Sequence, residues 1–180
     1  MGAQIDRVNA MHAAVTVPPD TVLLGGSPVP VSTRPSDRRR TRVEEHASGL
    51  VVHAPRNDGT PLRIAIEPWL RARARMAVEA SVARHAKQMG VKPAAVQIRA
   101  QRTRWGSCSR KGGLSFNWRL VQAPPDVLDY VVVHELAHIV HPNHSQAFWM
   151  LVHAHCPAYP SHKRWLRRHA GLLAADPCSV

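Results

Sequence analysis

Two histidines, His134 and His138, enclose Glu135 in the run His-Glu-Leu-Ala-His. On an α-helix, residues four positions apart share a face, so both imidazoles can bind one metal ion. Glu135 projects beside them, where its carboxylate can act as a general base on a metal-activated water. Apolar residues surround the motif over residues 129–140, a pattern typical of a buried helix. The sequence therefore predicts a buried helix that carries a catalytic metal site, and zinc is the metal that suits imidazole ligands.

A catalytic zinc site needs a third protein ligand, and the choice of residue can be narrowed by elimination. No glutamate follows Glu135, and the only later acid is Asp176, which excludes a site completed by a downstream glutamate. Six histidines remain: His141, His144, His153, His155, His162 and His169. Pro142 predicts that the helix ends near His141, after which His144 can turn back toward the metal. His141 is the alternative ligand if the helix continued. The predicted ligand set is His134, His138 and His144.

Two readings compete with a catalytic site. The motif can arise by chance on a helix whose histidines serve packing alone, but the buried helix, the helix stop and the third histidine argue against this. A purely structural zinc normally has four protein ligands, often cysteines. Cys108, Cys156 and Cys178 form no Cys-x-x-Cys pair, so this reading is not favoured either.

Several segments resemble one known family. They are Arg-Trp-Gly-Ser-Cys-Ser at 104–109, the alternating run at 114–120, Pro125, the motif helix at 129–138 and Asn-His-Ser-Gln-Ala-Phe-Trp at 143–149. Together they resemble the YgjP-like family of zinc metallopeptidases, a relative of the SprT and Spartan-type proteases. The resemblance extends over residues 20–170 and is most specific over residues 104–149.

The resemblance implies an α+β, zincin-like fold, in which a small, mostly antiparallel β-sheet packs on the HExxH helix beside further helices. It also implies that zinc is bound by His134, His138 and His144, with Glu135 as the catalytic base. Substrates of the family are poorly defined, so the resemblance indicates a chemistry rather than a target.

The chain as a whole is consistent with one domain. Its 180 residues suffice for a sizeable core, and we expect a flexible arm over residues 1–20 and a single domain over residues 21–180. No apolar run is long enough to cross a membrane, and the N-terminus does not read as a secretory signal. Three scattered cysteines are typical of a reducing compartment, so we expect a cytoplasmic protein. The sequence does not indicate an oligomeric state.

The net charge of +12 is unevenly distributed. Residues 61–125 hold ten arginines and three lysines against Glu67 and Glu79, a net charge of +11, whereas residues 126–180 are neutral overall. A basic segment just before the metal motif suits a nucleic acid or another polyanion near the active site. A solvated basic surface explains the same composition, and no separate nucleic-acid-binding motif is present.

The remaining pattern predicts the elements around the motif. Leu114–Leu120 alternates most cleanly and is the clearest predicted strand. Beside the active helix, residues 114–119 could pair with an extended substrate, although an ordinary core strand has the same pattern. Pro68 is expected to begin a helix that Gly90 ends, with His85 on its buried face. The other expected elements are a hairpin at 22–31, strands at 38–45, 49–54 and 96–101, and a loop at 102–113. The motif helix is expected to begin at 124–126, and two further helices are expected over 145–155 and 162–174.

Supporting roles are harder to assign. Tyr159, His153 and His155 follow the motif at a distance from which one of them could stabilise an oxyanion, although Pro160 indicates a turn at Tyr159. Asp129 or Asp126 could orient a ligand histidine, or Asp126 could cap the helix. We assign Cys108 a structural role, because the metal motif already supplies a complete mechanism.

These observations favour a zinc-dependent metallopeptidase that acts on peptide or protein substrates. Three alternatives remain: a DNA-associated protease of the SprT or Spartan type, a zinc hydrolase for a non-peptide amide, and a non-catalytic module that binds through its basic surface. The intact Glu135 argues against the last of these, because a scaffold has no use for a base beside the metal.

Overall fold

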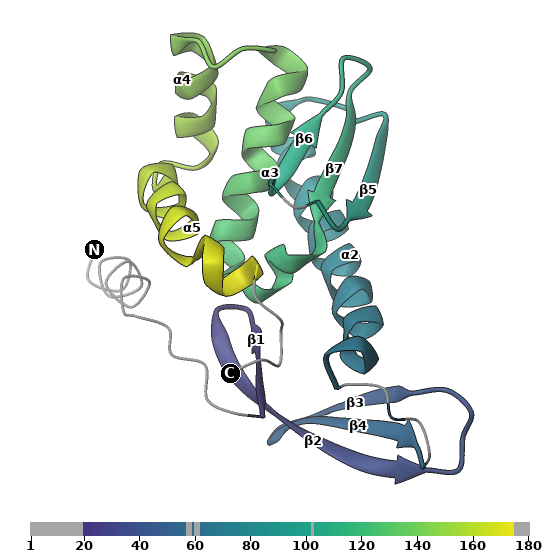
Figure 1. The fold of residues 1–180 in the computed structure, drawn as a ribbon. Coiled ribbons are helices and arrows are strands. Elements are labelled where there is room, and N and C mark those ends of the chain that lie inside the picture. The colour runs from purple at the N-terminus through teal and green to yellow at the C-terminus, as the bar shows by residue number, and fades with distance from the viewer. Residues whose placement is uncertain (1–19, 57–58, 60–61, 102, 175–180) are drawn as a thin grey trace.

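The computed structural model describes residues 20–56, 59, 62–101 and 103–174. Figure 1 shows a four-stranded sheet at one end, a second sheet with three helices at the other, and the long helix α2 (Leu62–Met89) running between them. The predicted N-terminal arm lies outside the described residues, apart from Asp20.

The N-terminal sheet has the strand order β1-β2-β4-β3. Its strands are β1 (Thr21–Leu24), β2 (Ser27–Ser36), β3 (Arg42–His46) and β4 (Gly49–Pro55). The predicted hairpin is confirmed: Gly25 and Gly26 form its turn with φ of 60° and 84°. A Cβ on Gly26 would stand 2.7 Å from the Pro124 side chain, so only glycine lets this turn approach the start of the motif helix.

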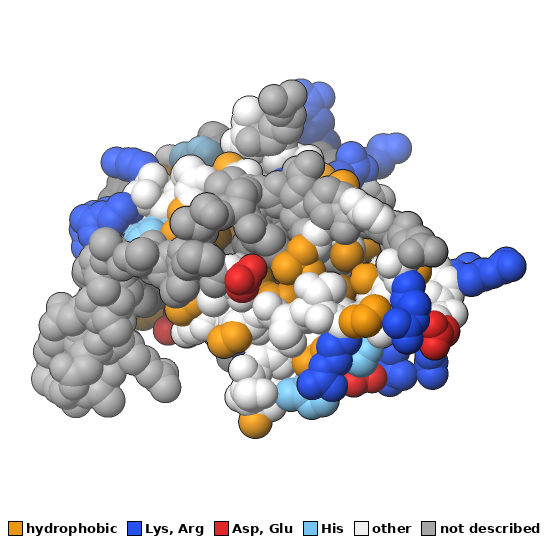
Figure 2. All heavy atoms as spheres, turned by 60° about the horizontal axis from the view of Figure 1, so that its bottom comes forward, with side chains coloured by type: hydrophobic (Ala, Val, Ile, Leu, Met, Phe, Trp, Pro, Cys, Tyr) orange, Lys and Arg blue, Asp and Glu red, His pale blue; other side chains and the backbone are white. Residues whose placement is uncertain are grey.

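The far end of this sheet carries mixed charge. Residues 37–40 form an exposed bend between β2 and β3, so the strand predicted over residues 38–45 begins later than expected. Figure 2 shows basic and acidic side chains next to one another at this end, and Arg56 pairs with Asp37 at 2.7 Å. The three arginines at 38–40 therefore belong to a solvated edge.

The second sheet is three-stranded, with the order β5-β7-β6. Its strands are β5 (Ala95–Arg99), β6 (Gly106–Cys108) and β7 (Gly113–Asn117). Strand β7 pairs in parallel with β5 and antiparallel with β6, so β7 is central and β6 is an edge strand. The expected loop at 102–113 thus contains a strand of three residues, too short to show an alternating pattern. The substrate-pairing role predicted for residues 114–119 is wrong, because both edges of β7 are already paired.

The helices complete the second part of the molecule. After β7 the chain forms a 3₁₀ helix, η1 (Trp118–Gln122), and then α3 (Pro125–Val140), α4 (Gln146–His155) and α5 (Tyr159–Ala174). The motif helix α3 lies between the three-stranded sheet and the pair α4 and α5 (Figure 1). A hydrophobic core surrounds it, with Val132, Val133, Leu136 and Ala137 fully buried. Burial on this scale stabilises α3 by roughly 1.5–3 kcal/mol for each large side chain.

Helix α2 contributes to two hydrophobic cores. Ile66, Leu70 and Ala74 pack against the N-terminal sheet, whereas Val78 and Val82 pack against α3 and its neighbours. The helix begins six residues before Pro68, where the sequence predicted its start. Proline lacks the N–H for one backbone hydrogen bond, and the complete burial of Ile66 against the sheet offsets that loss.

The α+β class is confirmed, with a small sheet packed on the HExxH helix. Of the five strand pairings in the described residues, three are antiparallel and two are parallel, so both sheets are mixed. None of the helices in the described ranges is long and apolar enough to cross a lipid bilayer.

Candidate metal centre

Helix α3 presents His134 and His138 on one face and ends two residues later, at Val140. The next residue, His141, has an extended backbone (φ −124°, ψ 100°), and its N–H bonds the Ala137 carbonyl at 2.8 Å. The predicted stop is therefore confirmed, and it has the expected cause, because Pro142 disfavours helical geometry at the residue before it.

The turn after α3 brings a third imidazole to the same place. His144, His134 and His138 each offer one ligand atom, and these atoms lie within 4.8 Å of one another. The Nε2 atoms of His134 and His144 are 3.2 Å apart. Two nitrogens bound tetrahedrally to one zinc at about 2.0–2.1 Å stand about 3.3 Å apart, so the spacing suits a shared metal ion. His144 immediately precedes Ser145, whose hydroxyl accepts a hydrogen bond from the Phe148 N–H and caps α4.

His141, the alternative ligand, has a different position. Its side chain does not join the cluster, but its backbone carbonyl lies 3.2 Å from the Nδ1 of His138. A carbonyl can only accept, so this contact requires the proton of His138 on Nδ1 and leaves its Nε2 lone pair free. The carbonyl thereby fixes both the tautomer and the orientation of the His138 ring.

Burial favours the neutral forms of His134 and His144. It lowers the pKa of His134 to about 3, with further contributions from the neighbouring His138 and His144 and from Lys163. Burial also lowers the pKa of His144, and His138 and Lys163 add to this effect. The Nδ1 of His134 is also buried and has no hydrogen-bond partner. Neutral imidazoles with free lone pairs are the form that binds a divalent cation, so these residues fit a zinc ion.

Two aromatic side chains, Phe148 and Trp149, pack against the three imidazole rings and fix their positions. Phe148 is fully buried, and its ring centroid lies 4.6–4.9 Å from those of His134, His138 and His144. Trp149 stacks on His144 at 5.6 Å. Both aromatic residues come from the first turn of α4, so the orientation of α4 against α3 fixes the cluster.

Glu135 is the most buried acid near the cluster, with 6% of its surface exposed. Burial raises its pKa to about 7, and the nearby Arg104 opposes part of that rise. Strand β6 covers this carboxylate: a Cβ on Gly106 would stand 2.6 Å from its Oε1 and 2.7 Å from its Cγ. Only glycine permits so close an approach, which explains the Gly in Arg-Trp-Gly-Ser-Cys.

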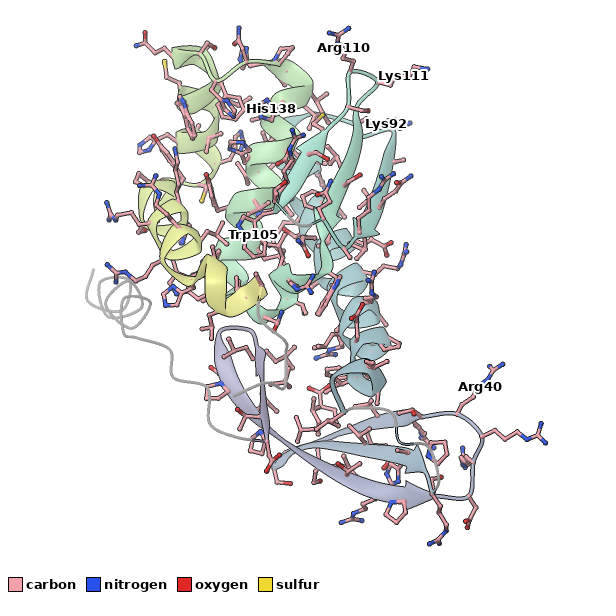
Figure 3. The ribbon with its side chains drawn as sticks, viewed as in Figure 1. Arg40, Lys92, Trp105, Arg110, Lys111 and His138 are labelled. Carbon is pink, nitrogen blue, oxygen red and sulfur yellow. The ribbon has the colours of Figure 1, made fainter. Side chains whose placement is uncertain are left out.

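A cavity of about 220 Å³ opens beside Glu135. Its walls include His134 and Glu135 from α3, Gly106 from β6 with the preceding Trp105, and Leu166 from α5. In Figure 3, Trp105 lies nearer to the start of α3 than His138 does. The cavity thus gives a bound molecule access to the Glu135 carboxylate and to one of the three imidazoles.

The sequence predicted that Asp129 or Asp126 could orient a ligand histidine, but neither aspartate does so. Asp129 instead accepts hydrogen bonds from Ser81 (2.6 Å) and Arg84 (2.6 and 2.7 Å) on α2. Asp126 is exposed in the first turn of α3, where its charge favours the helix dipole, but the N-cap residue is Pro124. The prediction that His85 is a core residue is confirmed: it is 9% exposed and lies beside Asp129.

The candidates for oxyanion stabilisation lie outside the histidine cluster. The Tyr159 ring stacks on Trp149 at 5.2 Å and on Tyr130 at 6.4 Å, and it is in ring contact with none of the three imidazoles. His153 is exposed and touches Tyr159, while His155 belongs to the last turn of α4. The Cys108 thiol has a raised pKa because of burial and the nearby Glu135, which does not favour a nucleophilic role.

Sequence reasoning missed Gly106, Arg104 and Phe148 as parts of the site. Nothing in the sequence shows that Gly106 meets Glu135, because the two residues are 29 positions apart. The available signal was the family resemblance, since all three residues lie in segments that carry it, at 104–109 and 143–149.

Comparison with known proteins gives one clear match. The model of the YgjP-like metallopeptidase domain matches residues 3–169. Among curated proteins, no match was found. Among solved structures, the metallopeptidase zymogen of Pyrococcus abyssi abylysin is similar to this chain, with 23% sequence identity and a TM-score of 0.47 over 55% of this chain and 97% of the other.

Proposed function

The chain belongs to the YgjP-like family of metal-dependent peptidases, and on this basis we propose that it hydrolyses peptide bonds with zinc held by His134, His138 and His144 and with Glu135 as general base. One observation carries the proposal: three imidazoles converge within 4.8 Å of one another beside a buried carboxylate. A bound zinc ion would polarise the substrate carbonyl and acidify a water.

The chain's own residues would handle the proton. Glu135 is the only carboxylate in the cavity wall, and its pKa of about 7 suits both acceptance and donation near neutral pH. It would accept a proton from the attacking water and then donate it to the leaving amine. Gly106 confines the carboxylate from the strand side, so the base is held in one position.

Strand β6 is the element best suited to hold an extended peptide. Within the described residues its backbone pairs only with β7, so its outer edge is open to a further strand. Gly106, at the start of β6, also touches the base. A peptide paired to this edge would therefore lie close to Glu135, by the usual mode of strand addition.

Metal content tests the ligand set. Protein purified without a metal-affinity tag is analysed for zinc, manganese, iron and cobalt per chain. We expect about one zinc in the wild type, much less in His144→Ala, and an unchanged amount in His141→Ala, which keeps the backbone carbonyl that contacts His138. A folded wild type that takes up no metal when zinc is supplied would contradict the proposal.

The role of Glu135 is tested with Glu135→Gln, which preserves size and removes the base. We expect normal zinc content and a loss of peptidase activity of at least about 10²–10⁴-fold. The screen uses a proteome-derived peptide mixture and a set of non-peptide amides. Cleavage of non-peptide amides alone would identify an amide hydrolase, and full activity in Glu135→Gln would reject the mechanism.

Nucleic-acid binding is a second candidate function. The basic surface that supports it is smaller than the net charge of the sequence indicates. Four arginines of α2 are paired with acids: Arg71, Arg73, Arg75 and Arg84. Within the described residues, Lys92, Arg110 and Lys111 have no such pairs, and they lie together at one end of the three-stranded sheet (Figure 3). We propose that any DNA contact uses these three residues, defined here as the loop cations. We also propose that the protein acts in the cytoplasm.

A further inference from the structure

A second cavity adjoins the one beside Glu135. Its volume is about 560 Å³, and it is bounded by the segment before β6, by the start of η1 and by the end of α5. Arg104 and Trp105 belong to the walls of both cavities, so the two are neighbours along the surface of the site. A substrate that reaches the base through the first cavity can therefore extend into the second.

The second cavity is positively charged. Arg104 and Arg119 both contribute to its wall, and none of its lining residues is acidic. In the described part of the chain, no acid pairs with either guanidinium. The Nε of Arg119 is moreover buried without a hydrogen-bond partner. Burying a donor without a partner is costly, and because Arg119 lines the cavity, the terminal N–H groups of its guanidinium are the ones that can donate to a bound acceptor.

The position of Arg119 is fixed by its surroundings. Its guanidinium stacks over the fully buried Trp118 ring, 4.6 Å from the centroid, and its backbone N–H bonds the Asn117 side chain at 3.1 Å. The Asn117 amide also donates to the Gln101 carbonyl at 2.7 Å and to the Arg104 carbonyl at 3.3 Å. One asparagine thus ties both cationic segments of the wall together, so the site is preorganised.

The opposite wall consists of small residues. Ala170, Gly171 and Ala174 on α5 face the cavity, and a Cβ built on Gly171 meets no atom within 4 Å. Glycine destabilises a helix interior by about 1 kcal/mol relative to alanine, so this position keeps space open at some expense of stability. The C-terminus of α5 carries roughly half a negative charge, which two guanidinium groups outweigh.

We infer that this cavity, defined as the arginine pocket, binds a carboxylate of the substrate and so selects peptides with an acidic side chain or a free C-terminal carboxylate near the scissile bond. A carboxylate matches the fork of donors that a guanidinium presents. The inference rests on the proposed function, since it assumes that a peptide occupies the cavity beside Glu135.

Binding to the Glu135→Gln protein tests this without hydrolysis. Three peptides are compared: acetyl-Ala-Ala-Gln amide, acetyl-Ala-Ala-Glu amide, and acetyl-Ala-Ala-Gln with a free C-terminus. Dissociation constants are measured by NMR, following the indole N–H of Trp105, which lines both cavities. We expect the peptides with a carboxylate to bind about tenfold more tightly than the neutral one. The better of the two identifies the source of the carboxylate.

Two variants locate the effect. Arg119→Gln removes the buried donor, and Gly171→Leu fills the pocket from the other wall without changing any charge; each should abolish the preference. Arg34→Gln, an exposed arginine of β2, is the matched control and should keep it. If both pocket variants keep the wild-type preference, the carboxylate binds elsewhere, for example at the metal, and the inference is overturned. Equal binding of all three peptides overturns it as well.

The two proposals fail separately. If the wild type cleaves no peptide but prefers carboxylates through Arg119, the peptidase assignment fails and the arginine pocket stands as an anion site. If the wild type cleaves peptides with no enrichment of acidic residues or C-termini, and Arg119→Gln leaves the cleavage pattern unchanged, the arginine pocket is rejected while the peptidase assignment survives.

Discussion

At the scale of single residues, the site depends on a missing side chain as much as on those present. Gly106 has no Cβ, and this lets β6 approach Glu135 to a distance that any other residue would prevent. The Glu135 carboxylate is therefore confined by the backbone of the same edge strand that we propose to hold the substrate. Substrate and base would be positioned by one element, so a shift of that element would affect both.

We predict that Gly106→Ala inactivates the enzyme without unfolding it. The new methyl group would stand 2.6 Å from Oε1 and 2.7 Å from Cγ of Glu135, so this side chain, and not a backbone segment, would have to shift. A displacement of about 1 Å at a catalytic group can reduce the rate about 10²-fold. Activity, zinc content and thermal unfolding are measured together. Gly113→Ala is the control, since its Cβ meets only the Ser109 hydroxyl at 3.2 Å. Unchanged activity in Gly106→Ala would show that the carboxylate is not confined.

At the scale of elements, Asp129 joins α2 to α3. Its carboxylate accepts hydrogen bonds from Ser81 and from the charged Arg84 of α2, and the Nε2 of His85 lies 3.6 Å away. Burial alone would raise the pKa of Asp129, but the interactions with His85, Ser81 and Arg84 lower it below the usual value. The motif helix is thereby attached to the long helix by a charged contact as well as by apolar packing.

The lowered pKa of Asp129 has a consequence for acid stability. Because the folded protein binds this proton less readily than the unfolded chain, the contribution is complete above about pH 4, the unfolded pKa of an aspartate, and is lost as the pH falls through the folded pKa. We predict that Asp129→Asn lowers the free energy of unfolding by about 2 kcal/mol at pH 7 and by less at pH 3.

Denaturant unfolding of both proteins at the two pH values checks this prediction. The release of metal at low pH is common to both and cancels in the difference between them. Asp37→Asn serves as the control, because its ion pair with Arg56 is exposed and such pairs contribute little. A difference between wild type and Asp129→Asn that is equal at pH 7 and pH 3 would contradict the assignment.

The sequence predicted elements whose signal is local. The motif helix and its stop before Pro142 follow from spacing and from proline, and the turn at Gly25 and Gly26 from two glycines in succession. Strand β6 was missed because three residues carry no periodicity, and its assignment depends on pairing with β7. The early start of α2 was missed because it depends on burial of Ile66 against strands more than ten residues away.

The residues of the candidate site also differ in whether a local sequence signal predicts them. His134, His138 and His144 could be selected from spacing and elimination, and the structure brings these three together. The role of Asp129 was predicted wrongly, since position on the helix does not reveal which neighbour the side chain meets. Tertiary contacts such as Gly106 with Glu135 join segments that no local rule relates.

At the scale of the whole molecule, net charge overstates the free positive surface. The excess of +11 in residues 61–125 includes the α2 arginines that pair with acids. The loop cations, Lys92, Arg110 and Lys111, lie in the same half of the molecule as His138, and Arg40 lies at the opposite end (Figure 3). A backbone hydrogen bond from Ala94 to Gly112, 2.9 Å long, holds the two loops that carry them together.

If DNA is a partner, the loop cations should account for the salt dependence of binding. Each phosphate contact contributes about −0.9 to the slope of log K against log salt concentration. Replacing Lys92, Arg110 and Lys111 with glutamine should therefore reduce the slope by about 3, measured by fluorescence anisotropy with a short duplex between 50 and 200 mM salt. Replacing the three arginines at 38–40, at the opposite end of the molecule, removes the same charge and should leave the slope unchanged. Equal reductions in both variants would indicate attraction by net charge alone, and the absence of binding in the wild type would remove the nucleic-acid alternative.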